Sequence, residues 1–362
     1  MLQTYKYKLN PNKAQRLSLQ RTLDTCREIW NMALEQRKYQ RTHWTVQCRE
    51  LTELKVGFPE YKQVHVHVLQ NVVKKLQRSF ERMWELGAGF PRFKSKQRYH
   101  SFAFNNTGFS LSGKYLQLSK IGNVKVRLSR EIPENAVIKS LTLKQTVSGW
   151  YACFAVEVPT QPLPVSDAAV GIDVGIENFA ALSDGTMIPN PRFYEQGQAA
   201  LRVAQRRVAR RKKGSVRRRK AVVLLKKVHE HIQSKRLDWA HKVTTGLVNR
   251  FGTIVLENLN IKGLAQGILA KQVHDCGWSQ FITLLKYKAE NAGRRVVEVD
   301  ARYTSQECPA CGTRKKKSLS ERTHECSECG LVLHRDTTAA QVILGRMCPL
   351  DAKIGEPIPC LV

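Results

Sequence analysis

The chain has 362 residues, and its 60 Lys and Arg against 30 Asp and Glu give a formal net charge of +30. Such an excess destabilises a compact fold unless a polyanion screens it, so nucleic acid is the expected partner. No apolar stretch approaches the roughly 20 residues that span a bilayer, and the first residues, MLQTYK, lack the apolar core of a signal peptide, which predicts a cytoplasmic, nucleoid-associated protein without a membrane partner.

The N-terminal part is predicted to begin with a strand and to continue as helices. In residues 4–9, Tyr and Leu alternate with Lys, the period of a half-buried strand, and Asn10-Pro11-Asn12 ends it. Two amphipathic helices follow, with apolar residues three or four positions apart. Their apolar stripes indicate helix packing, whereas the basic face of the second helix fits either a solvated surface or phosphate binding. The first stripe is Leu19, Leu23, Cys26, Trp30 and Ala33; the second is Leu69, Val73, Leu76, Phe80 and Met83, with Lys74, Lys75, Arg78 and Arg82 opposite.

Between residues 90 and 160 the pattern changes to short alternating segments, with a hairpin turn predicted at Ser148-Gly149. This pattern indicates a small antiparallel barrel or sandwich, which the strand at 4–9 would complete. The helices would then be an insertion. We therefore predict a β-rich, barrel-like domain of residues 1–12 and 90–160, with a helical domain of residues 13–89 inserted into it.

Beyond a linker predicted at 161–165, strands and helices alternate. Strand, hairpin, strand, helix, strand, helix is the order of an RNase H-like fold around a mixed sheet. The chain is thus predicted to be a multidomain α+β protein whose α/β domain spans 166–305 and 331–347, with a loose tail at 348–362. The predicted elements are a buried strand at 170–182 with a turn at 183–185, a basic helical region at about 195–248 interrupted at Gly214-Ser215, a strand at 253–257, a helix at 277–292, a strand at 295–299 and a helix at 336–344.

Three carboxylates lie inside or at the ends of these predicted elements. Asp173 lies inside an apolar strand, where an unpaired charge is costly. Glu257 closes the next strand and Asp336 opens the last helix. Taken alone, Glu257 could simply mark a strand end, and Asp336 is more simply an N-cap. Taken together, they predict a catalytic site in which Asp and Glu oxygens hold two divalent metal ions for phosphodiester cleavage.

Four cysteines form two CxxC pairs separated by 14 residues: Cys308, Cys311, Cys326 and Cys329. Thiolates at this spacing predict a zinc ribbon, residues 306–330, holding one Zn²⁺. A closed four-sulfur site leaves no position for water, so the zinc is expected to be structural, and the nearby His324 and His334 are not needed as ligands. The other six cysteines show no pairing pattern and are expected to be reduced.

A second basic feature lies in the helical hairpin. From Arg206 to Lys220, ten of the fifteen residues are Arg or Lys. This density exceeds what a solvated helix face requires, so we expect phosphate neutralisation that weakens as salt rises, without base specificity. The expected contacts are Arg206, Arg207, Arg210, Arg211, Lys212, Lys213, Arg217 and Arg218, together with Lys74 and Lys75 of the N-terminal helices.

Several segments resemble TnpB, the RNA-guided nuclease family of insertion-sequence transposons that is related to type V CRISPR effectors. The likeness rests on GIDVG at 171–175, LENL at 256–259, Arg335-Asp336 and the motifs CPACG and CSECG; FPRFK at 90–94, RRKKGS at 210–215, HKVTT at 241–245 and YTSQ at 303–306 extend it. It implies a RuvC-type nuclease domain with Asp173, Glu257 and Asp336 as magnesium ligands, and a helical recognition domain inserted into a β-rich wedge domain.

The same resemblance implies the partners. A guide RNA from the transposon end would pair with double-stranded target DNA beside a short adjacent motif, with motif contacts near Trp44, Gln70 and Asn105. Where the family often has Asn two residues after the last catalytic Asp, this chain has Thr338. Two other hypotheses remain open: an RNA-guided binder that represses without cutting, and a DDE-type transposase that joins DNA ends.

Overall fold

The computed structural model describes residues 1–347 except 41, 106, 161, 319 and 320. The predicted tail at 348–362 lies outside the described residues. The chain divides into two compact units, with the boundary between Pro159 and Thr160. The boundary falls next to the proline-rich segment that the sequence marks as a linker.

The first unit is built on an antiparallel sheet of seven strands in the order β2-β6-β7-β1-β5-β4-β3. The N-terminal strand lies inside this sheet, between β7 and β5, and so joins residues far apart in the sequence. The order has β2 and β3 at its two ends. The strands are β1 (Leu2–Asn10), β2 (Ser101–Phe104), β3 (Phe109–Ser112), β4 (Tyr115–Leu118), β5 (Gly122–Arg127), β6 (Val137–Thr146) and β7 (Gly149–Glu157).

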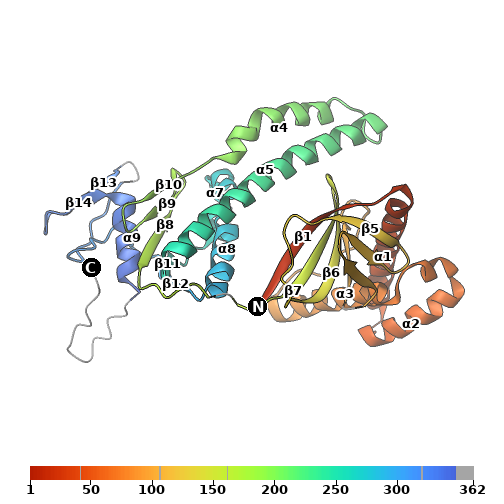
Figure 1. Ribbon diagram of the computed structural model, residues 1–362. Helices are drawn as coiled ribbons and strands as arrows, with labels where there is room; N and C mark the ends of the chain where they lie inside the picture. Colours follow the sequence, from red (N-terminus) through yellow and green to blue (C-terminus); the bar gives the residue numbers. More distant parts are fainter. Residues whose placement is uncertain (41, 106, 161, 319–320, 348–362) are drawn as a thin grey trace. The chain divides into compact units, whose positions relative to one another are not determined.

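Helices enter this unit between β1 and β2 (Figure 1). Asn12 starts the first helix with a capping box, because its side chain accepts from Gln15 N at 2.8 Å while Gln15 Oε1 accepts from Asn12 N at 3.0 Å. A helix at 44–57 is absent from the sequence predictions, because only Gln47 and Leu51 of it are buried and no apolar stripe marks it. The helices are α1 (Lys13–Tyr39), α2 (Trp44–Gly57), the short 3₁₀ helix η1 (Pro59–Gln63) and α3 (Val66–Leu86).

The second unit contains a mixed sheet in the order β10-β9-β8-β11-β12, in which β8, β11 and β12 run parallel and β9 runs antiparallel to β8. The prediction of one strand over 170–182 was wrong. The chain turns after Val174, and apolar residues continue on both sides of the turn because both strands are buried. The strands are β8 (Ala169–Val174), β9 (Asn178–Leu182), β10 (Met187–Pro189), β11 (Thr253–Glu257) and β12 (Arg295–Val299).

Helices pack on both faces of the mixed sheet. Val170, Ile172 and Ile254 pack in one core with residues of the helices α5 and α8. On the other face Val255 packs with Ile343 of α9. The helices are α4 (Phe193–Ala209), α5 (Val216–Arg250), α6 (Ile261–Leu264), α7 (Ala270–Cys276), α8 (Trp278–Asn291) and α9 (Arg335–Gly345), and a small hairpin of β13 (Thr323–Glu325) and β14 (Val332–His334) leads into α9.

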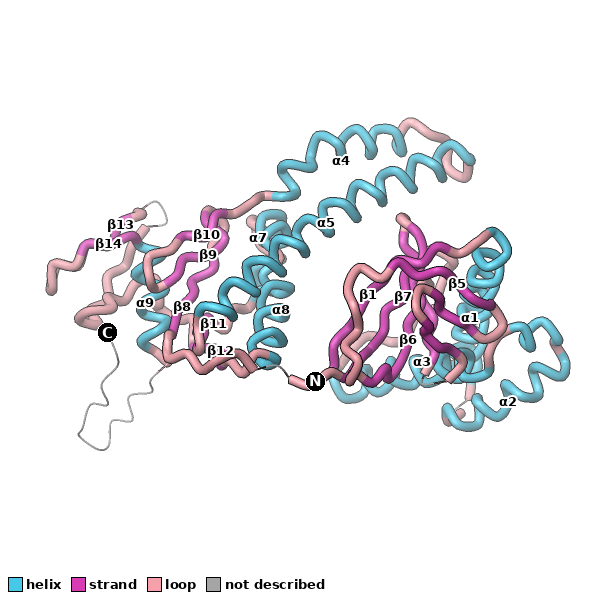
Figure 2. Tube along the Cα trace, viewed as in Figure 1, coloured by secondary structure: helices cyan, strands magenta, loops and turns pink. Residues whose placement is uncertain are grey.

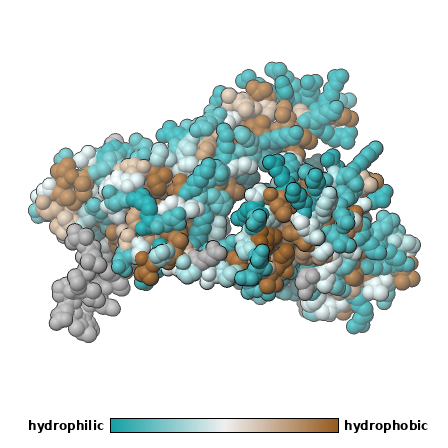
Figure 3. Space-filling view, viewed as in Figure 1, coloured by the Kyte–Doolittle hydropathy of each residue, from teal (hydrophilic) through white to brown (hydrophobic). Residues whose placement is uncertain are grey.

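The predicted basic hairpin is formed by α4 and α5, which run side by side (Figure 2). Ser215, in the predicted interruption, caps α5 by accepting from Arg218 N at 3.1 Å. In the space-filling view, hydrophilic side chains fringe the hairpin and apolar ones lie between its helices (Figure 3). Among the described residues, no helix is both long and apolar enough to cross a membrane.

Candidate active site and metal centre

Asp173 and Glu257 lie side by side on neighbouring parallel strands. Strands β8 and β11 pair with Ile172 opposite Leu256, and the two acids are the next residue of each strand. Alternate residues of a strand face the same side of the sheet. Because Ile172 and Leu256 face the core with α8, both carboxylates face the α9 side.

Helix α9 brings Asp336 to the same place. A Cβ on Gly171 would lie 2.0 Å from the carbonyl oxygen of Ala340, so α9 packs directly on the backbone of β8. Asp173 is two residues beyond Gly171 on the same face of the strand. Asp336 is four residues, about one helical turn, before Ala340. The two steps have similar lengths, about 6.6 Å along the strand and about 6 Å along the helix, which sets Asp336 near Asp173.

The electrostatics of the site agree with this placement. The pKa of Asp173 is raised well above its usual value, first by burial and then by the negative charges of Glu257 and Asp336, with a smaller opposing effect of Arg335. None of the three acids forms an ion pair with a Lys, Arg or His of the described residues. The site therefore favours a bound proton or a cation.

Glu257 has a hydrogen-bond partner that the sequence predictions did not include. Glu257 is buried at 9% exposure, and Thr304, 4% exposed, donates its hydroxyl hydrogen to Oε1 of Glu257. Burial raises the pKa of Glu257, while this bond and the charge of Arg346 lower it. The only sequence signal for Thr304 was its place in the YTSQ segment.

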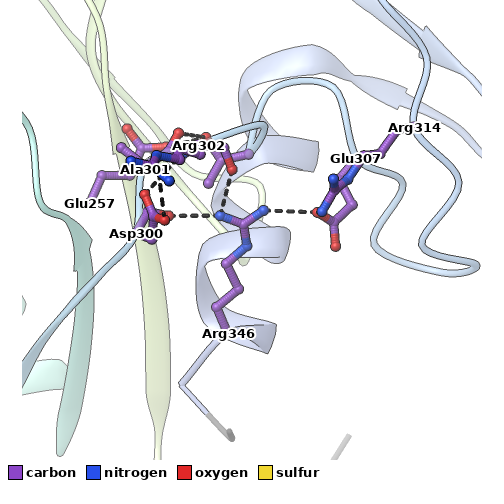
Figure 4. Close-up of polar contacts among 8 residues, drawn as sticks. Glu257, Asp300, Ala301, Arg302, Glu307, Arg314 and Arg346 are labelled. Atoms are coloured by element: carbon purple, nitrogen blue, oxygen red, sulfur yellow. Dashed lines mark hydrogen bonds and ion pairs between the residues drawn. The ribbon is translucent and has the colours of Figure 1, made fainter. Parts of the chain in front are cut away.

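Arg346 holds the loop that carries Thr304. Its Nη1 donates to the carbonyl oxygens of Asp300 and Arg302 at 2.7 and 2.8 Å. Its Nη2 donates to Glu307 Oε2 at 2.8 Å, and Glu307 also lies 3.6 Å from Arg314 (Figure 4). Arg346 directly follows α9, the helix that begins with Asp336, so its guanidinium connects the C-terminal end of that helix to the loop at 300–307. No sequence pattern indicated this role.

Thr338 lies where the resemblance leads one to expect Asn. Its side chain is 1% exposed, and its hydroxyl donates to the carbonyl oxygen of His334 at 3.0 Å. His334 in turn caps α9, because its Nδ1 accepts from Asp336 N at 3.2 Å. Thr338 therefore stabilises the first turn of α9 and does not displace the carboxylate.

The four predicted cysteines come together in the described structure. Their sulfur atoms all lie within 4.8 Å of one another. Among the described residues, no other group of three or more Cys, His, Asp or Glu side chains is as close together. The three carboxylates are not drawn together to that distance. Two matching turns present the sulfurs: Gly312 and Gly330 have φ of +74° and +70°, and their N–H groups donate to Cys308 O at 2.9 Å and Cys326 O at 3.0 Å.

The acidity of the thiols reflects this crowding. Hydrogen bonds from Thr313 lower the pKa of Cys311 to about 6. The backbone of Leu331 has the same effect on Cys329, but desolvation and the neighbouring cysteine sulfurs outweigh it and raise the pKa of Cys329 to about 12. A thiolate is the form that binds metal. The cluster could therefore hold a structural zinc, with a cation taking the place of the shared protons.

The predicted phosphate contacts of the α4–α5 hairpin differ in exposure. Seven of the eight basic residues predicted there are exposed. Arg218 is half-buried, and its Nη1 donates to the carbonyl oxygens of Val208 at 2.8 Å and Arg211 at 3.0 Å. Arg218 therefore closes the turn between α4 and α5, and its charge is partly used inside the protein. The exposed residues are Arg206, Arg207, Arg210, Arg211, Lys212, Lys213 and Arg217.

The residues predicted to contact the adjacent motif gather around α3. The Nζ of Lys74 lies 5.3 Å from the ring centroid of Trp44, and Gln70 is one helical turn before Lys74. Asn71 Nδ2 donates to the carbonyl oxygen of Ala103 at 2.9 Å, which ties this part of α3 to strand β2, just before Asn105. The Nζ of Lys75, the next residue of α3, lies 5.9 Å from the ring centroid of Tyr99.

Sequence relatives show the family of this chain, and a solved structure shows its fold. A protein of Streptomyces pristinaespiralis named "Putative RNA-guided DNA endonuclease" is 33% identical over 356 residues, covering 94% of this chain and 88% of the relative. The chain belongs to the TnpB family. The Escherichia coli K12 relative InsQ, which carries the same description, is 28% identical and covers 95% of this chain and 92% of the relative.

Family models match the TnpB-like chain in three segments. Residues 153–267 match a model described as "Probable transposase", and residues 278–343 match a Cas12f1-like TNB domain. A helix-turn-helix model matches residues 1–43, a range that includes β1 and α1. A Cas12f1 in complex with single-guide RNA and target DNA shares the fold, with a TM-score of 0.61, 15% identity, and coverage of 91% of this chain and 82% of that one.

Proposed function

We propose that this protein is an RNA-guided DNA endonuclease that uses Asp173, Glu257 and Asp336 to cleave target DNA beside a short adjacent motif. The observation that carries the proposal is the register of β8 and β11, in which Asp173 and Glu257 directly follow the paired residues Ile172 and Leu256, with α9 packed on β8 at Gly171. The full-length relatives named as RNA-guided DNA endonucleases support the guide and the substrate. A DNA substrate in turn favours a cytoplasmic protein on the nucleoid.

The sheet order supports an RNase H-like, RuvC-type domain. Three parallel strands and an antiparallel hairpin form a mixed sheet with helices on both faces, as the predicted element order requires. The first unit would then supply the wedge sheet and the inserted recognition helices. The basic α4–α5 hairpin would neutralise phosphates of the guide or the target.

The carboxylates fit a magnesium site. They offer hard oxygen ligands, and Asp173 is half-buried, with a raised pKa and no ion pair to a described Lys, Arg or His. Magnesium, when bound, would supply activation of the attacking water and charge stabilisation at the leaving oxygen.

The protein's own groups prepare this site. Thr304 holds Glu257 in one orientation and lowers its pKa, so that the carboxylate is more readily ionised. Arg346 fixes the loop that presents Thr304. The apolar strands around Asp173 restrict water, which strengthens electrostatic interactions with a phosphate. The cysteine cluster would hold one zinc and stabilise the hairpin that leads into α9.

The test uses the protein purified with its co-expressed RNA. That RNA is sequenced, and matching DNA with a randomised flank is offered with Mg²⁺. Cuts that depend on the guide match and on the flank, and that disappear in Asp173→Ala while DNA binding is kept, are expected. Guide-dependent binding without cuts under any divalent metal would instead identify a repressor, and joined DNA ends would identify a transposase.

A further inference from the structure

Residues 87–98 form an irregular but ordered segment between α3 and strand β2, here called the 87–98 segment. Gly87 ends α3 with φ of +62°, a conformation that favours glycine. The segment is strongly basic, because it contains Arg92, Lys94, Lys96 and Arg98 and no Asp or Glu. All four side chains except that of the half-buried Lys94 are exposed.

Two consecutive residues of α1 hold the backbone of this segment. Trp30 Nε1 donates to the carbonyl oxygen of Arg92 at 3.1 Å. Asn31 both donates to the carbonyl oxygen of Lys94 at 3.1 Å and accepts from Lys94 N at 2.8 Å, as a neighbouring strand would. Pro91, within the segment, is buried. These side chains therefore fix the shape of the 87–98 segment, although water could have satisfied its backbone hydrogen-bonding groups.

Aromatic rings are left exposed beside this fixed backbone. Trp84 and Phe90 are 64% and 52% exposed, and both contact the buried ring of Phe80. The ring centroids of Trp84 and Phe80 lie 5.7 Å apart in a stacked arrangement, and those of Phe90 and Phe80 lie 5.5 Å apart edge to face. Phe93, in the same segment, is 51% exposed. The ammonium group of Lys94 lies 5.2 Å from the ring centroid of Trp30, which leaves Arg92, Lys96 and Arg98 as the exposed cations of the segment. Single exposed apolar residues are ordinary, but rings grouped around a common ring, in and next to a strongly basic segment, mark a binding surface.

We propose that Trp84 and Phe90 form a stacking platform for unpaired bases of single-stranded nucleic acid, with the exposed cations of the 87–98 segment on the adjoining phosphates. Every base has a flat π face, and Lys and Arg neutralise the backbone, so this combination suits single strands of any sequence. A duplex hides its base faces and would gain only the charge contacts. The proposed function enters only in naming the strand, an unpaired stretch of the guide RNA.

The experiment compares Trp84→Ala, Phe90→Ala and the double variant with the unaltered chain. Binding is measured by fluorescence anisotropy with a labelled unstructured RNA of about 15 nucleotides, with DNA of the same sequence, and with a duplex of the same length. Each single variant is expected to raise the Kd for single strands about tenfold, to leave the duplex Kd unchanged and to keep the same salt slope. The RNA and DNA arms decide which strand the platform prefers.

Two controls separate stacking from folding and from charge. Trp84→Phe keeps a ring and should retain most of the affinity. Tyr39→Ala removes a ring that is 74% exposed on α1 and should change nothing. Photocrosslinking of 4-thiouridine RNA to the unaltered chain is expected to mark the peptide that holds Trp84 and Phe90, and it serves as the test should a variant unfold. Unchanged single-strand affinity in the folded double variant, or crosslinks only elsewhere, would overturn the platform. Because neither readout needs guided cleavage, its failure is distinguishable from failure of the proposed function.

Discussion

Thr304 donates a hydrogen bond to the buried carboxylate of Glu257, although 47 positions separate the two residues in the chain. The bond holds Glu257 at the end of β11 and opposes the rise in pKa that burial causes. It therefore acts on the orientation and on the ionisation of a proposed magnesium ligand. Loss of such a supporting bond typically costs about 10–100-fold in metal affinity or activity.

Thr304→Val keeps the shape of the side chain and removes the donor. We expect DNA cleavage to fall by about tenfold at neutral pH. The acid limb of the pH–rate profile should also move to higher pH, because the pKa of Glu257 rises further and more hydroxide is needed to ionise it. Thr304→Ser keeps the hydroxyl and should stay close to the unaltered enzyme. Identical pH profiles for Val and Ser variants would contradict this role.

Asp173→Asn should stabilise the metal-free protein. The raised pKa of Asp173 means that the unfolded chain loses this proton first as the pH rises, so stability is lost between the unfolded-state and folded-state pKa values. The gain in the free energy of unfolding is expected to be about 1 kcal/mol near neutral pH and to vanish below about pH 4. Thermal melts in EDTA at both pH values measure it.

Magnesium should make the unaltered protein the more stable of the two. The unaltered protein is expected to gain thermal stability with added Mg²⁺, whereas Asp173→Asn should gain little, because binding to the native state stabilises it. An equal Mg²⁺ response in both proteins would remove Asp173 from the ligand set.

Gly171→Ala should separate α9 from β8. Its Cβ would lie 2.0 Å from Ala340 O and 2.8 Å from Leu344 N, and neither backbone atom can move alone. We expect a loss of about 2–3 kcal/mol in the free energy of unfolding, and loss of cleavage because Asp336 shifts with the helix. Gly246→Ala, in α5 with nothing within 4 Å of the new Cβ, should be neutral or stabilising by up to about 1 kcal/mol. Matching melting temperatures for the two variants would count against the close packing.

Cys326→Ser should reduce the zinc content of the purified protein, which is expected to be one ion per chain. The physical consequence reaches α9, because β14 leads directly into that helix and Arg335 N donates to the carbonyl oxygen of Arg322 at 2.8 Å. Amide hydrogen exchange over 323–336 should rise. Cys48→Ala, outside the cluster, is the control for elemental analysis. Full zinc occupancy in Cys326→Ser would exclude a four-sulfur site.

The basic residues of the α4–α5 hairpin should separate into two classes. Arg206→Gln and Arg210→Gln remove exposed charges, so each should weaken RNA binding and lower the slope of log K against log salt by about 0.7–0.9, with unchanged stability. Arg218→Gln should instead destabilise the turn, because Arg218 bonds two carbonyl oxygens across it. Thermal melts and salt titrations of the three variants test this; equal salt slopes for the exposed variants and the unaltered chain would refute phosphate contact.

Local patterns were sufficient for most elements of the second unit. Strand β12 has the predicted bounds, and α8 and α9 begin and end within one residue of them, because burial of one face leaves a regular period in the sequence. The turn between β8 and β9 was not predicted, because the sequence stays apolar on both sides of it. The family resemblance also rested on the sequence, and the match to the Streptomyces relative confirmed it.

By itself the sequence determined the charge, the spacing of the cysteines and the identity of three candidate acids, because these are properties of residue type and of short separations. Only the tertiary structure decided which side chains hold these acids, and the loop beside them, in position. Thr304 reaches Glu257 across a chain separation of 47, and Arg346 closes on the loop at 300–307. Such contacts depend on how β11, α9 and an irregular loop pack, and packing between distant segments leaves no period in a single sequence.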